Sequence, residues 1–301
     1  MSNLRNFLKV TVSAARLEFL VIPFLLVGVG HAASSYNGKT SVIVSVIALV
    51  GLLFVHLAVN ILNETSDYRS GIDENTDKTP FSGGSKALVN SDVNVKWVET
   101  VGMVFLLLGA VVGIYFIVFS SILIAPVLLL GVFIAYTYTD YLTKYTLGET
   151  GMALGLGVLP VIGVDIVQND SIGVVSALVS LPIALVAFNL LLMNEFPDFE
   201  ADLEGGRQNI IHRFGWRNAT TVYILVACLT QVTIVLAYVL SSVEWYFLLT
   251  MISSIFLYRP VSWVLGDPME TPENAVIRDN LLWNITTTLI AFVTLMIPVM
   301  M

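Results

Sequence analysis

The sequence predicts an all-α membrane protein in which nine transmembrane helices form a bundle around a central cavity. Of its 301 residues, 56% are hydrophobic and only 12% are charged, whereas a soluble domain carries roughly 25% charged residues. About 20 apolar residues are needed to cross the hydrocarbon core of a bilayer, and such runs recur along the whole chain. The predicted spans are residues 17–34, 41–62, 97–119, 121–139, 150–168, 171–193, 219–240, 244–259 and 280–300.

The first span follows a basic, polar start and lacks a small-residue cleavage site, so we expect a membrane helix there and not a cleaved signal peptide. The third and fourth spans are nearly fused at Ser120 and Ser121, where we expect a tight turn. Four glycines of the fifth span, Gly151, Gly155, Gly157 and Gly163, are expected to serve close helix packing. The whole chain, 1–301, is expected to form a single domain.

The basic residues orient the predicted spans. With nine spans, every Lys and Arg except Lys39 falls on the side that holds the N-terminus or at its edge. Because basic loops stay in the cytoplasm, we expect an integral protein of the cell membrane with its N-terminus and its chemistry at the cytoplasmic face. The net charge of -8 and the absence of a basic patch in the sequence argue against nucleic acid as a partner.

Two acid-rich segments follow the second and sixth predicted spans. Each begins with an Asn and an Asp four residues apart, Asn63 with Asp67 and Asn194 with Asp198, and residues at that spacing share one face of a helix. One more acid follows each pair, Asp73 in the first segment and Asp202 in the second. Since repeats in membrane proteins commonly build a site at their interface, we expect both segments to face the central cavity.

The residue types in these segments favour Mg²⁺ over zinc. Four carboxylates and two amide oxygens with no nearby His or Cys form a set of hard ligands. Mg²⁺ is commonly held by one or two carboxylates plus substrate phosphates, so two segments suggest two ions that bridge a diphosphate. The expected metal ligands are Asp67, Asp73, Asp198 and Asp202. Cations expected at the same face, as donors to phosphate oxygens, are Lys78, Lys144, Arg207 and Arg16.

Other polar residues carry weaker signals. His56 lies one turn before Asn60 in a predicted span, where polar groups face the bundle interior, and it is a secondary candidate for acceptor contact or proton transfer. Glu195, Glu200 and Glu204 are expected to be solvated or to support a helix. Asp165 is expected to lie in a loop on the opposite face.

With these motifs the chain resembles the UbiA superfamily of intramembrane prenyltransferases. Nine helices with one Asn/Asp motif after the second and another after the sixth are similar to the superfamily's plan. The first motif, N-D-x-x-D followed by another Asp, matches at Asn63, Asp67 and Asp73, although Glu64 replaces its first Asp. The six-residue step to Asp73 and the Y-x-S-G-x-D turn before it resemble the menaquinone-type branch, the 1,4-dihydroxy-2-naphthoate prenyltransferases.

Three further matches carry site residues over from the family. The basic-T-P-x-x-G-G segment of that branch matches with Lys78 as a diphosphate contact, and the tail of the second motif puts Arg207 in its basic position. The family's Tyr-x-x-x-Lys motif matches at Lys144 only, because Asp140 stands where the Tyr is expected and Tyr138 lies nearby.

The resemblance implies a Mg²⁺-dependent transfer of a polyprenyl group from an isoprenoid diphosphate to a small aromatic quinone precursor, with membrane lipid around the tail. The catalytic residues that it implies are Asp67, Asp73, Asp198, Asp202 and Lys144. The substrate-binding residues are Asn63, Lys78, Asn194, Arg207, Arg16 and Tyr138. Two rivals stay open: a non-quinone acceptor (a glycerol-phosphate lipid, or a haem or chlorophyll precursor) and a cation-coupled transporter. Transporters bury ionisable groups near the midplane, whereas these acids are predicted at helix ends.

Overall fold

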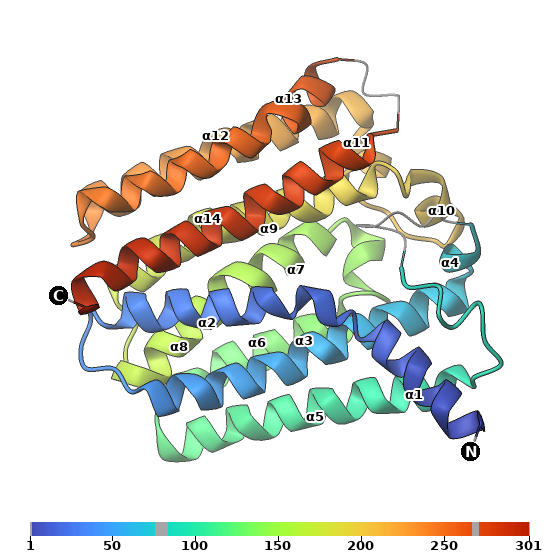
Figure 1. Ribbon diagram of the computed structural model, residues 1–301, viewed down its shortest axis with the longest axis horizontal. Helices are drawn as coiled ribbons and strands as arrows, with labels where there is room; N and C mark the ends of the chain where they lie inside the picture. The colour runs from blue at the N-terminus through green and yellow to red at the C-terminus, as the bar shows by residue number, and fades with distance from the viewer. Residues whose placement is uncertain (1, 76–83, 267–270, 301) are drawn as a thin grey trace.

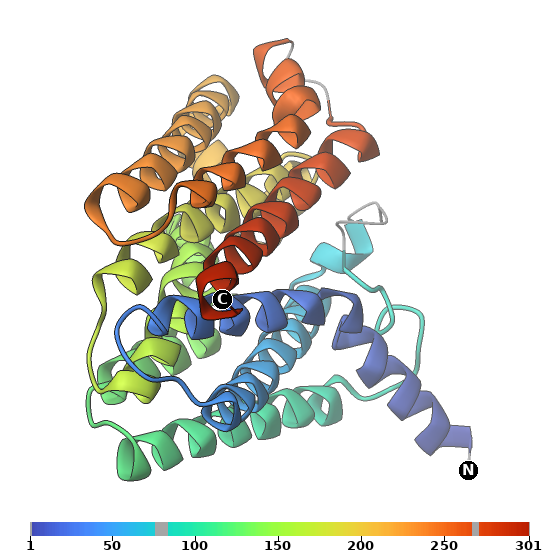
Figure 2. The same ribbon diagram turned by 60° about the vertical axis from the view of Figure 1, so that its left-hand side comes forward.

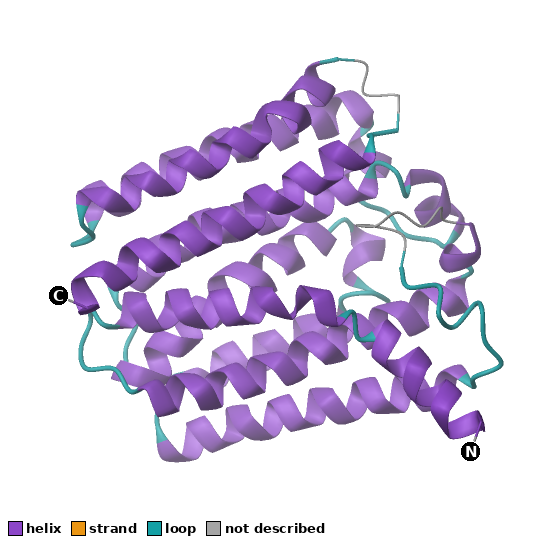
Figure 3. Cartoon of the chain, viewed as in Figure 1, coloured by secondary structure: helices purple, strands orange, loops and turns teal. Residues whose placement is uncertain are grey.

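The computed structural model describes residues 2–75, 84–266 and 271–300, and all regular elements in these ranges are helices (Figures 1 and 3). The helices of the bundle are η1 (Leu17–Leu20) with α2 (Val21–Ser34), α3 (Val42–Ser70), α5 (Val95–Phe119), α6 (Ile124–Thr137), α7 (Gly148–Ala153) with η3 (Leu154–Val158) and α8 (Leu159–Asn169), α9 (Val174–Glu195), α12 (Trp216–Leu240), η4 (Trp245–Leu257) with α13 (Tyr258–Leu265), and α14 (Asn274–Met300). The shorter helices are α1 (Ser2–Ala14), α4 (Ile72–Asn75), η2 (Leu142–Tyr145), α10 (Phe199–Glu204) and α11 (Ile210–Phe214).

The predicted class, an all-α membrane bundle, is confirmed. In the described ranges, 8 helical segments are long and apolar enough to cross a membrane, and α6 is a shorter apolar helix of 14 residues. The predicted number of nine spans is therefore reached only when α6 is included. Its place fits the prediction, since Ser120 and Ser121 form the tight turn between α5 and α6.

Helix α3 is longer than hydropathy predicts, because it continues past residue 62 to Ser70. Its last turns are polar, yet they keep helical geometry until Gly71 adopts a left-handed conformation with φ 78°, as helix C-termini commonly do. Hydropathy reports only the part of a helix that sits in the bilayer. As a result, Asn63 and Asp67 lie inside a helix that extends beyond its apolar part and not in a loop.

The long helices lie side by side, with α3 against α5, α9 against α12, and α2 against α8 (Figures 1 and 2). The C-terminal end of α3, α4 and α10 gather at one end of the bundle (Figure 1). Helices α6, α8 and α3 pack on one another beside them. The two acid-rich segments are therefore brought to the same end of the molecule, as predicted.

Candidate functional site

One cavity of about 390 Å³ extends from the acid-rich end into the bundle. Its deeper walls are mostly apolar and come from α3, α5, α6, η3 and α8. Its polar end is lined by Arg16, Asn63, Asp67, Asp73, Tyr138, Asn194, Asp198, Asp202 and Arg207. The first and second Asn/Asp segments therefore share one hollow, although they are more than a hundred residues apart in the chain.

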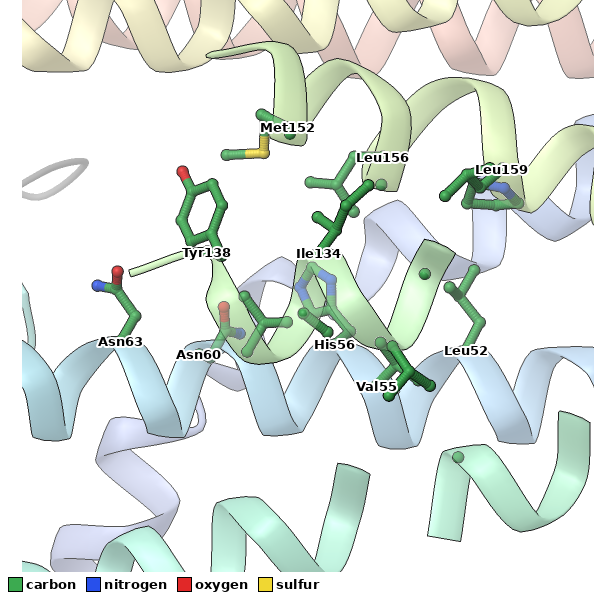
Figure 4. A pocket seen from close by; sticks show the side chains of 18 of the residues that line it. Leu52, Val55, His56, Asn60, Asn63, Ile134, Tyr138, Met152, Leu156 and Leu159 are labelled. Atoms are coloured by element: carbon green, nitrogen blue, oxygen red, sulfur yellow. The ribbon is translucent and has the colours of Figure 1, made fainter. Parts of the chain in front are cut away.

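Helix α3 presents a polar stripe to this cavity. His56, Asn60, Asn63 and Asp67 follow one another at intervals of four, three and four residues, which places them on one helix face, and Figure 4 shows the first three on the side that faces Tyr138. The Asn63 amide donates to Asp67 Oδ2 at 2.8 Å and its oxygen accepts from the Thr139 hydroxyl at 3.2 Å. Asn63 therefore holds the Asp67 carboxylate in position.

Asn60 fixes the junction between α1 and η1. Its amide donates to the Ala15 carbonyl at 3.0 Å, and the next residue, Arg16, has a left-handed backbone with φ 48° and ψ 59°. A left-handed conformation costs a residue other than glycine on the order of 1 kcal/mol and is found preferentially at functional sites. Here it turns the chain so that Arg16 lines the cavity.

Arg207 joins the two acid-rich segments directly. Its guanidinium forms an ion pair with Asp67 of α3 and a second one, at 3.3 Å, with Asp202 of α10. The carboxylate of Asp202 also accepts from Asn209 at 3.3 Å. Burial lowers the pKa of the Arg207 guanidinium, whereas the carboxylates of Asp67 and Asp202 raise it. The net effect is a raised pKa. One partly buried cation therefore holds both acids at the mouth of the cavity.

Several oxygens at this mouth lack a partner. Within the described residues, Asp73 Oδ2, Asn194 Oδ1 and Asp198 Oδ1 are buried without a hydrogen bond. Burial, with the nearby Glu64 and Asp67, raises the pKa of Asp73 to about 7; burial and the nearby Asp202 raise that of Asp198 to about 7. Because an unsatisfied buried polar group is costly, these oxygens indicate a place for a cation or a donor group.

These oxygens suit a hydrated Mg²⁺ ion whose coordination shell is completed by substrate phosphate oxygens. No group of three or more His, Cys, Asp and Glu side chains stands ready to hold a metal in the ranges 2–75, 84–266 and 271–300. Mg²⁺ does not require such a cage, since it keeps several waters and takes one or two carboxylates plus phosphate oxygens. The donor set therefore fits Mg²⁺ in the presence of a diphosphate.

Of the predicted cations, Lys144 does not line the main cavity. Lys144 is exposed and lines a smaller recess beside the main cavity, which it shares with Arg207 and Asp140, and Lys78 lies outside the described residues. Asp140, in the position of the family's Tyr, accepts from the Ser66 hydroxyl at 2.6 Å. It therefore joins the end of α6 to the end of α3.

Tyr138 lines the main cavity. Burial, followed by the neighbouring Glu195, raises the pKa of its phenol. The group therefore keeps its proton at neutral pH and can donate a hydrogen bond into the cavity.

Glu64, the departure from the family's first motif, has a structural contact. Its side chain is only 1% exposed, and its carboxylate accepts from the Ser85 backbone N–H at 2.9 and 3.1 Å and from the Ser85 hydroxyl. A Cβ on the neighbouring Gly84 would lie 2.4 Å from Asp73 Oδ1. Glu64 and Gly84 thus hold the returning chain close against Asp73.

The expectation for Glu195 was wrong. It is 7% exposed, lines the cavity and lies near Glu149, which is 1% exposed. Glu149 accepts from the Ile210 backbone N–H at 2.9 Å, and the carboxyls of Glu149 and Glu195 lie within hydrogen-bonding reach of each other. The signal that could have found them is their place at the ends of two predicted spans, where ionisable residues are seldom buried without a function.

The fold and site together define a class: polytopic membrane proteins with an acid-lined mouth above an apolar cavity. The model of the UbiA prenyltransferase family matches residues 21–296. The chain therefore belongs to that family, which confirms the predicted resemblance and, with it, the class of enzyme.

Two curated relatives are similar in sequence. One is the 1,4-dihydroxy-2-naphthoate octaprenyltransferase of Bacillus subtilis, 28% identical over 69% of this chain and 66% of the relative. The other is the UbiA prenyltransferase domain-containing protein 1 of Dictyostelium discoideum, 26% identical over 66% of this chain and 61% of the relative. The matches thus span slightly less than two thirds of both relatives. The first supports the menaquinone-type branch.

Solved structures share the fold. A UbiA homologue from Aeropyrum pernix has a TM-score of 0.72 at 12% identity, covering 94% of this chain and 99% of that one. A homologue from Archaeoglobus fulgidus, bound to DMAPP and Mg²⁺, has a TM-score of 0.65 at 14% identity, covering 95% of this chain and 99% of the other. At these identities the likeness establishes the fold alone.

Proposed function

We propose that the protein transfers a polyprenyl group from an isoprenoid diphosphate to a small aromatic acceptor in a Mg²⁺-dependent reaction, with a naphthoate quinone precursor as the favoured acceptor. The observation that carries the proposal is that Arg207 pairs with both Asp67 and Asp202 at the mouth of a cavity whose deeper walls are apolar. The named activity of the Bacillus relative and the DMAPP and Mg²⁺ of the Archaeoglobus structure support it.

The mouth binds the diphosphate. Asp67, Asp73, Asp198 and Asp202 would hold Mg²⁺, which when bound supplies Lewis-acid stabilisation of the leaving group. Arg207 and Arg16 line the same cavity and are the donors for phosphate oxygens, since guanidinium groups match phosphate geometry. Asn63 keeps Asp67 oriented, and Asn194 and Asp198 line the same cavity.

The neighbouring residues assist the departure of diphosphate. When the allylic C–O bond breaks, its electron pair leaves with the diphosphate, and fixed donors stabilise the charge that develops there. Tyr138 lies in the cavity with its proton retained. Lys144 lines the recess that it shares with Arg207 and is proposed to contact the diphosphate from there. Lys78 is proposed as a further diphosphate contact.

The deeper, apolar part of the cavity binds the hydrocarbon tail. Its walls exclude water from the electron-poor allylic carbon, which leaves the acceptor ring as the nucleophile that forms the new C–C bond. The acceptor carbon then loses its proton or its carboxyl group, according to the acceptor. This arrangement accounts for an enzyme embedded in the membrane, because both donor tail and product are lipids.

The test is product formation by the purified protein in lipid nanodiscs with geranylgeranyl diphosphate, Mg²⁺ and separate acceptors. We expect prenylated dihydroxynaphthoate by mass spectrometry, with release of one diphosphate per product. Prenylation of a glycerol-phosphate lipid or of a haem or chlorophyll precursor instead would identify a different acceptor. Cation uptake into proteoliposomes without diphosphate release would overturn the proposal in favour of a transporter.

The mouth is proposed to face the cytoplasm of the cell membrane. The support is the concentration of Lys and Arg on the side of the N-terminus, as the positive-inside rule expects. A membrane-impermeant thiol reagent applied to intact cells should label Lys39→Cys and spare Asp140→Cys in a Cys228→Ser background. The reverse pattern would show the opposite orientation.

A further inference from the structure

Two buried glutamates lie together at the polar end of the cavity, apart from the proposed metal ligands. Glu149 belongs to the first turn of α7 and Glu195 is the last residue of α9, and these two helices pack on each other. Glu195 is 7% exposed and lines the cavity, whereas Glu149 is 1% exposed and does not line it. The pair therefore presents one carboxyl group to a ligand and keeps the other inside the protein.

The two carboxyl groups share a proton. They lie within hydrogen-bonding reach of each other, and apart from this contact the Oε2 atoms of both have no partner within the described residues. Two ionised carboxylates so close together repel each other strongly, so one of them keeps its proton and donates it to the other. Glu149 also accepts from the Ile210 backbone N–H at 2.9 Å. Glu149 is thus the anchored member, and Glu195 is the one that faces the cavity.

Tyr138 completes a group of side chains around Glu195. Both line the cavity and they interact electrostatically. A Cβ on Gly151 of α7 would lie 3.5 Å from the Tyr138 ring, and Figure 4 shows this ring pointing toward Met152 of the same helix. Leu191, one turn before Glu195 on α9, also lines the cavity. A phenol donor, a carboxyl group and apolar side chains thus border one part of the cavity, and this combination suits a hydroxylated aromatic ring.

A second buried group indicates that the cavity binds more than a diphosphate and a hydrocarbon tail. His56 is 8% exposed and lines the cavity, and within the described residues its Nε2 is buried without a partner. It lies about 16 Å from Asp67 along α3, out of reach of a diphosphate held there. An unsatisfied buried nitrogen is costly, and a prenyl tail carries no atom that pairs with it. A hydroxylated acceptor does carry such atoms.

We propose that Glu195 binds a ring hydroxyl of the aromatic acceptor and takes its proton, with Glu149 as the residue that positions it. The inference rests on the proposed function and adds the group that activates its acceptor. The hydroxyl proton passes to Glu195, and the electron pair of the O–H bond stays on the acceptor oxygen, where it makes the ring more nucleophilic. The adjacent ring carbon then bonds to the allylic carbon, as the donor C–O bond breaks and its electron pair leaves with the diphosphate.

The proton balance closes within the pair. Before the reaction the two glutamates hold one proton and one negative charge, and after the transfer from the acceptor they hold two protons. The prenylated ring carbon then loses CO₂ from its carboxylate, or a proton that passes to the diphosphate. The electron pair of that bond restores the aromatic ring and a negative oxygen. This oxygen takes its proton back from Glu195, and the pair returns to its first state.

The test is prenyl transfer to dihydroxynaphthoate by Glu195→Gln in nanodiscs. The new amide oxygen still accepts from the acceptor hydroxyl and its N–H donates to Glu149, but an amide takes no proton. We therefore expect kcat to fall at least about 100-fold, while the acceptor KM stays within about threefold of the unchanged protein. The donor KM and the Mg²⁺ requirement should not change.

The acidity of the acceptor provides a readout that a purely structural role would not move. A base matters less when the hydroxyl is more acidic. The ratio of kcat between the unchanged protein and Glu195→Gln should therefore shrink several-fold when the acceptor ring carries an electron-withdrawing chlorine. Any effect of the chlorine on the ring itself is common to both proteins and cancels in this ratio.

Two further variants serve as controls. In Glu149→Gln the amide donates to Glu195 and its oxygen still accepts from Ile210, so kcat should fall by less than about tenfold. Glu273→Gln removes a carboxylate from an exposed position at the start of α14 and should leave every constant unchanged. A kcat of Glu195→Gln within about threefold of the unchanged protein, a loss confined to the donor KM or the Mg²⁺ requirement, or a ratio independent of acceptor acidity would each overturn the proposal.

Ligand binding to the unchanged protein tests the proposal even if Glu195→Gln fails to fold. With Mg²⁺ and an unreactive thiolo analogue of geranyl diphosphate present, 1-hydroxy-2-naphthoate should bind at least about tenfold more tightly than 2-naphthoate, which lacks the hydroxyl. Equal affinities would overturn the proposal. The proposed function itself fails only if the unchanged protein transfers no prenyl group, whereas this inference fails if transfer occurs without the expected dependence on Glu195.

Discussion

The two ends of the bundle both bury an aspartate, and they treat it differently. At the end opposite the mouth, Asp165 of α8 is 0% exposed, and its carboxylate accepts from the Gly173 backbone N–H at 2.6 Å and from the Asn169 amide at 3.0 Å. At the mouth, Asp73 and Asp198 each keep one buried oxygen without a donor among the described residues. A carboxylate satisfied by its own chain stabilises the fold, whereas one left unsatisfied beside a cavity indicates a ligand site.

The two histidines of the spans repeat this contrast. His31 Nδ1 shares a hydrogen bond of 2.8 Å with the Ser45 hydroxyl, next to the Asp165 end, where Gln168 also contacts Ser45 at 2.9 Å. His56, by contrast, has a buried nitrogen without a partner in the described part of the chain. Residue type alone therefore does not separate these two histidines, whereas the hydrogen bond of His31 and the unpartnered nitrogen of His56 do.

The largest expected effect is at the mouth. Asp67→Asn and Asp198→Asn each remove a charge where Mg²⁺ and diphosphate are proposed to bind, and we expect kcat to fall about 1,000-fold. Prenyl transfer in nanodiscs measures it, with size-exclusion elution and circular dichroism as controls for folding. Turnover within about tenfold of the unchanged protein for both variants would contradict the assignment of the ligand site to the mouth.

Arg207→Gln is expected to have the next largest effect. It leaves Asp67 and Asp202 without their shared cation, and breaking a buried pair costs about 3 kcal/mol or more. Melting temperature should fall strongly without Mg²⁺ and recover more on addition of Mg²⁺ than in the unchanged protein. The control is Arg69→Gln, because Arg69 pairs with Glu99 in a more exposed position and should change stability by less than about 1 kcal/mol. Equal losses in the two variants would contradict the bridging role of Arg207.

Asp165→Asn should affect stability and spare activity. The amide cannot accept from both Gly173 and Asn169, so we expect a loss of about 1–3 kcal/mol while kcat per folded molecule stays the same. Thermal unfolding and prenyl transfer on the same preparation separate the two effects. A loss of activity comparable to that of Asp198→Asn, without loss of stability, would indicate a functional role for the end of the bundle opposite the mouth.

The smallest effect is a dependence of stability on pH. The pKa of Asp73 and Asp198 is raised from 3.8 to about 7 in the folded protein, so between these values the folded state binds more protons than the unfolded one. Stability without a metal should therefore fall as the pH rises from about 4 to about 7. Because Mg²⁺ replaces those protons, the rise in melting temperature that it produces should be larger at pH 8 than at pH 6. A larger rise at pH 6 would contradict this reasoning.

Much of the fold could be predicted because its signals are local. The turn at Ser120 and Ser121 and the spans themselves follow from runs of apolar residues. The end of α3 could not be located, because hydropathy stops at the membrane surface while helical hydrogen bonding continues to Ser70. Glu195 was misjudged for a related reason: its neighbours in the chain include charged residues, but it is buried in α9, which packs on α7, the helix that carries Glu149.

The sequence by itself determined that this is a membrane bundle and which oxygen-bearing side chains share a helix face, because hydrophobic runs and i, i+4 spacing are properties of short stretches. Only the tertiary structure decided that Arg207 would reach Asp67 across the two segments, and that Glu64 would hold Ser85 in place. It also decided that Gly131 would border hollow space and Gly157 a neighbouring backbone. These outcomes depend on contacts between residues far apart in the chain, which arise only when the helices pack.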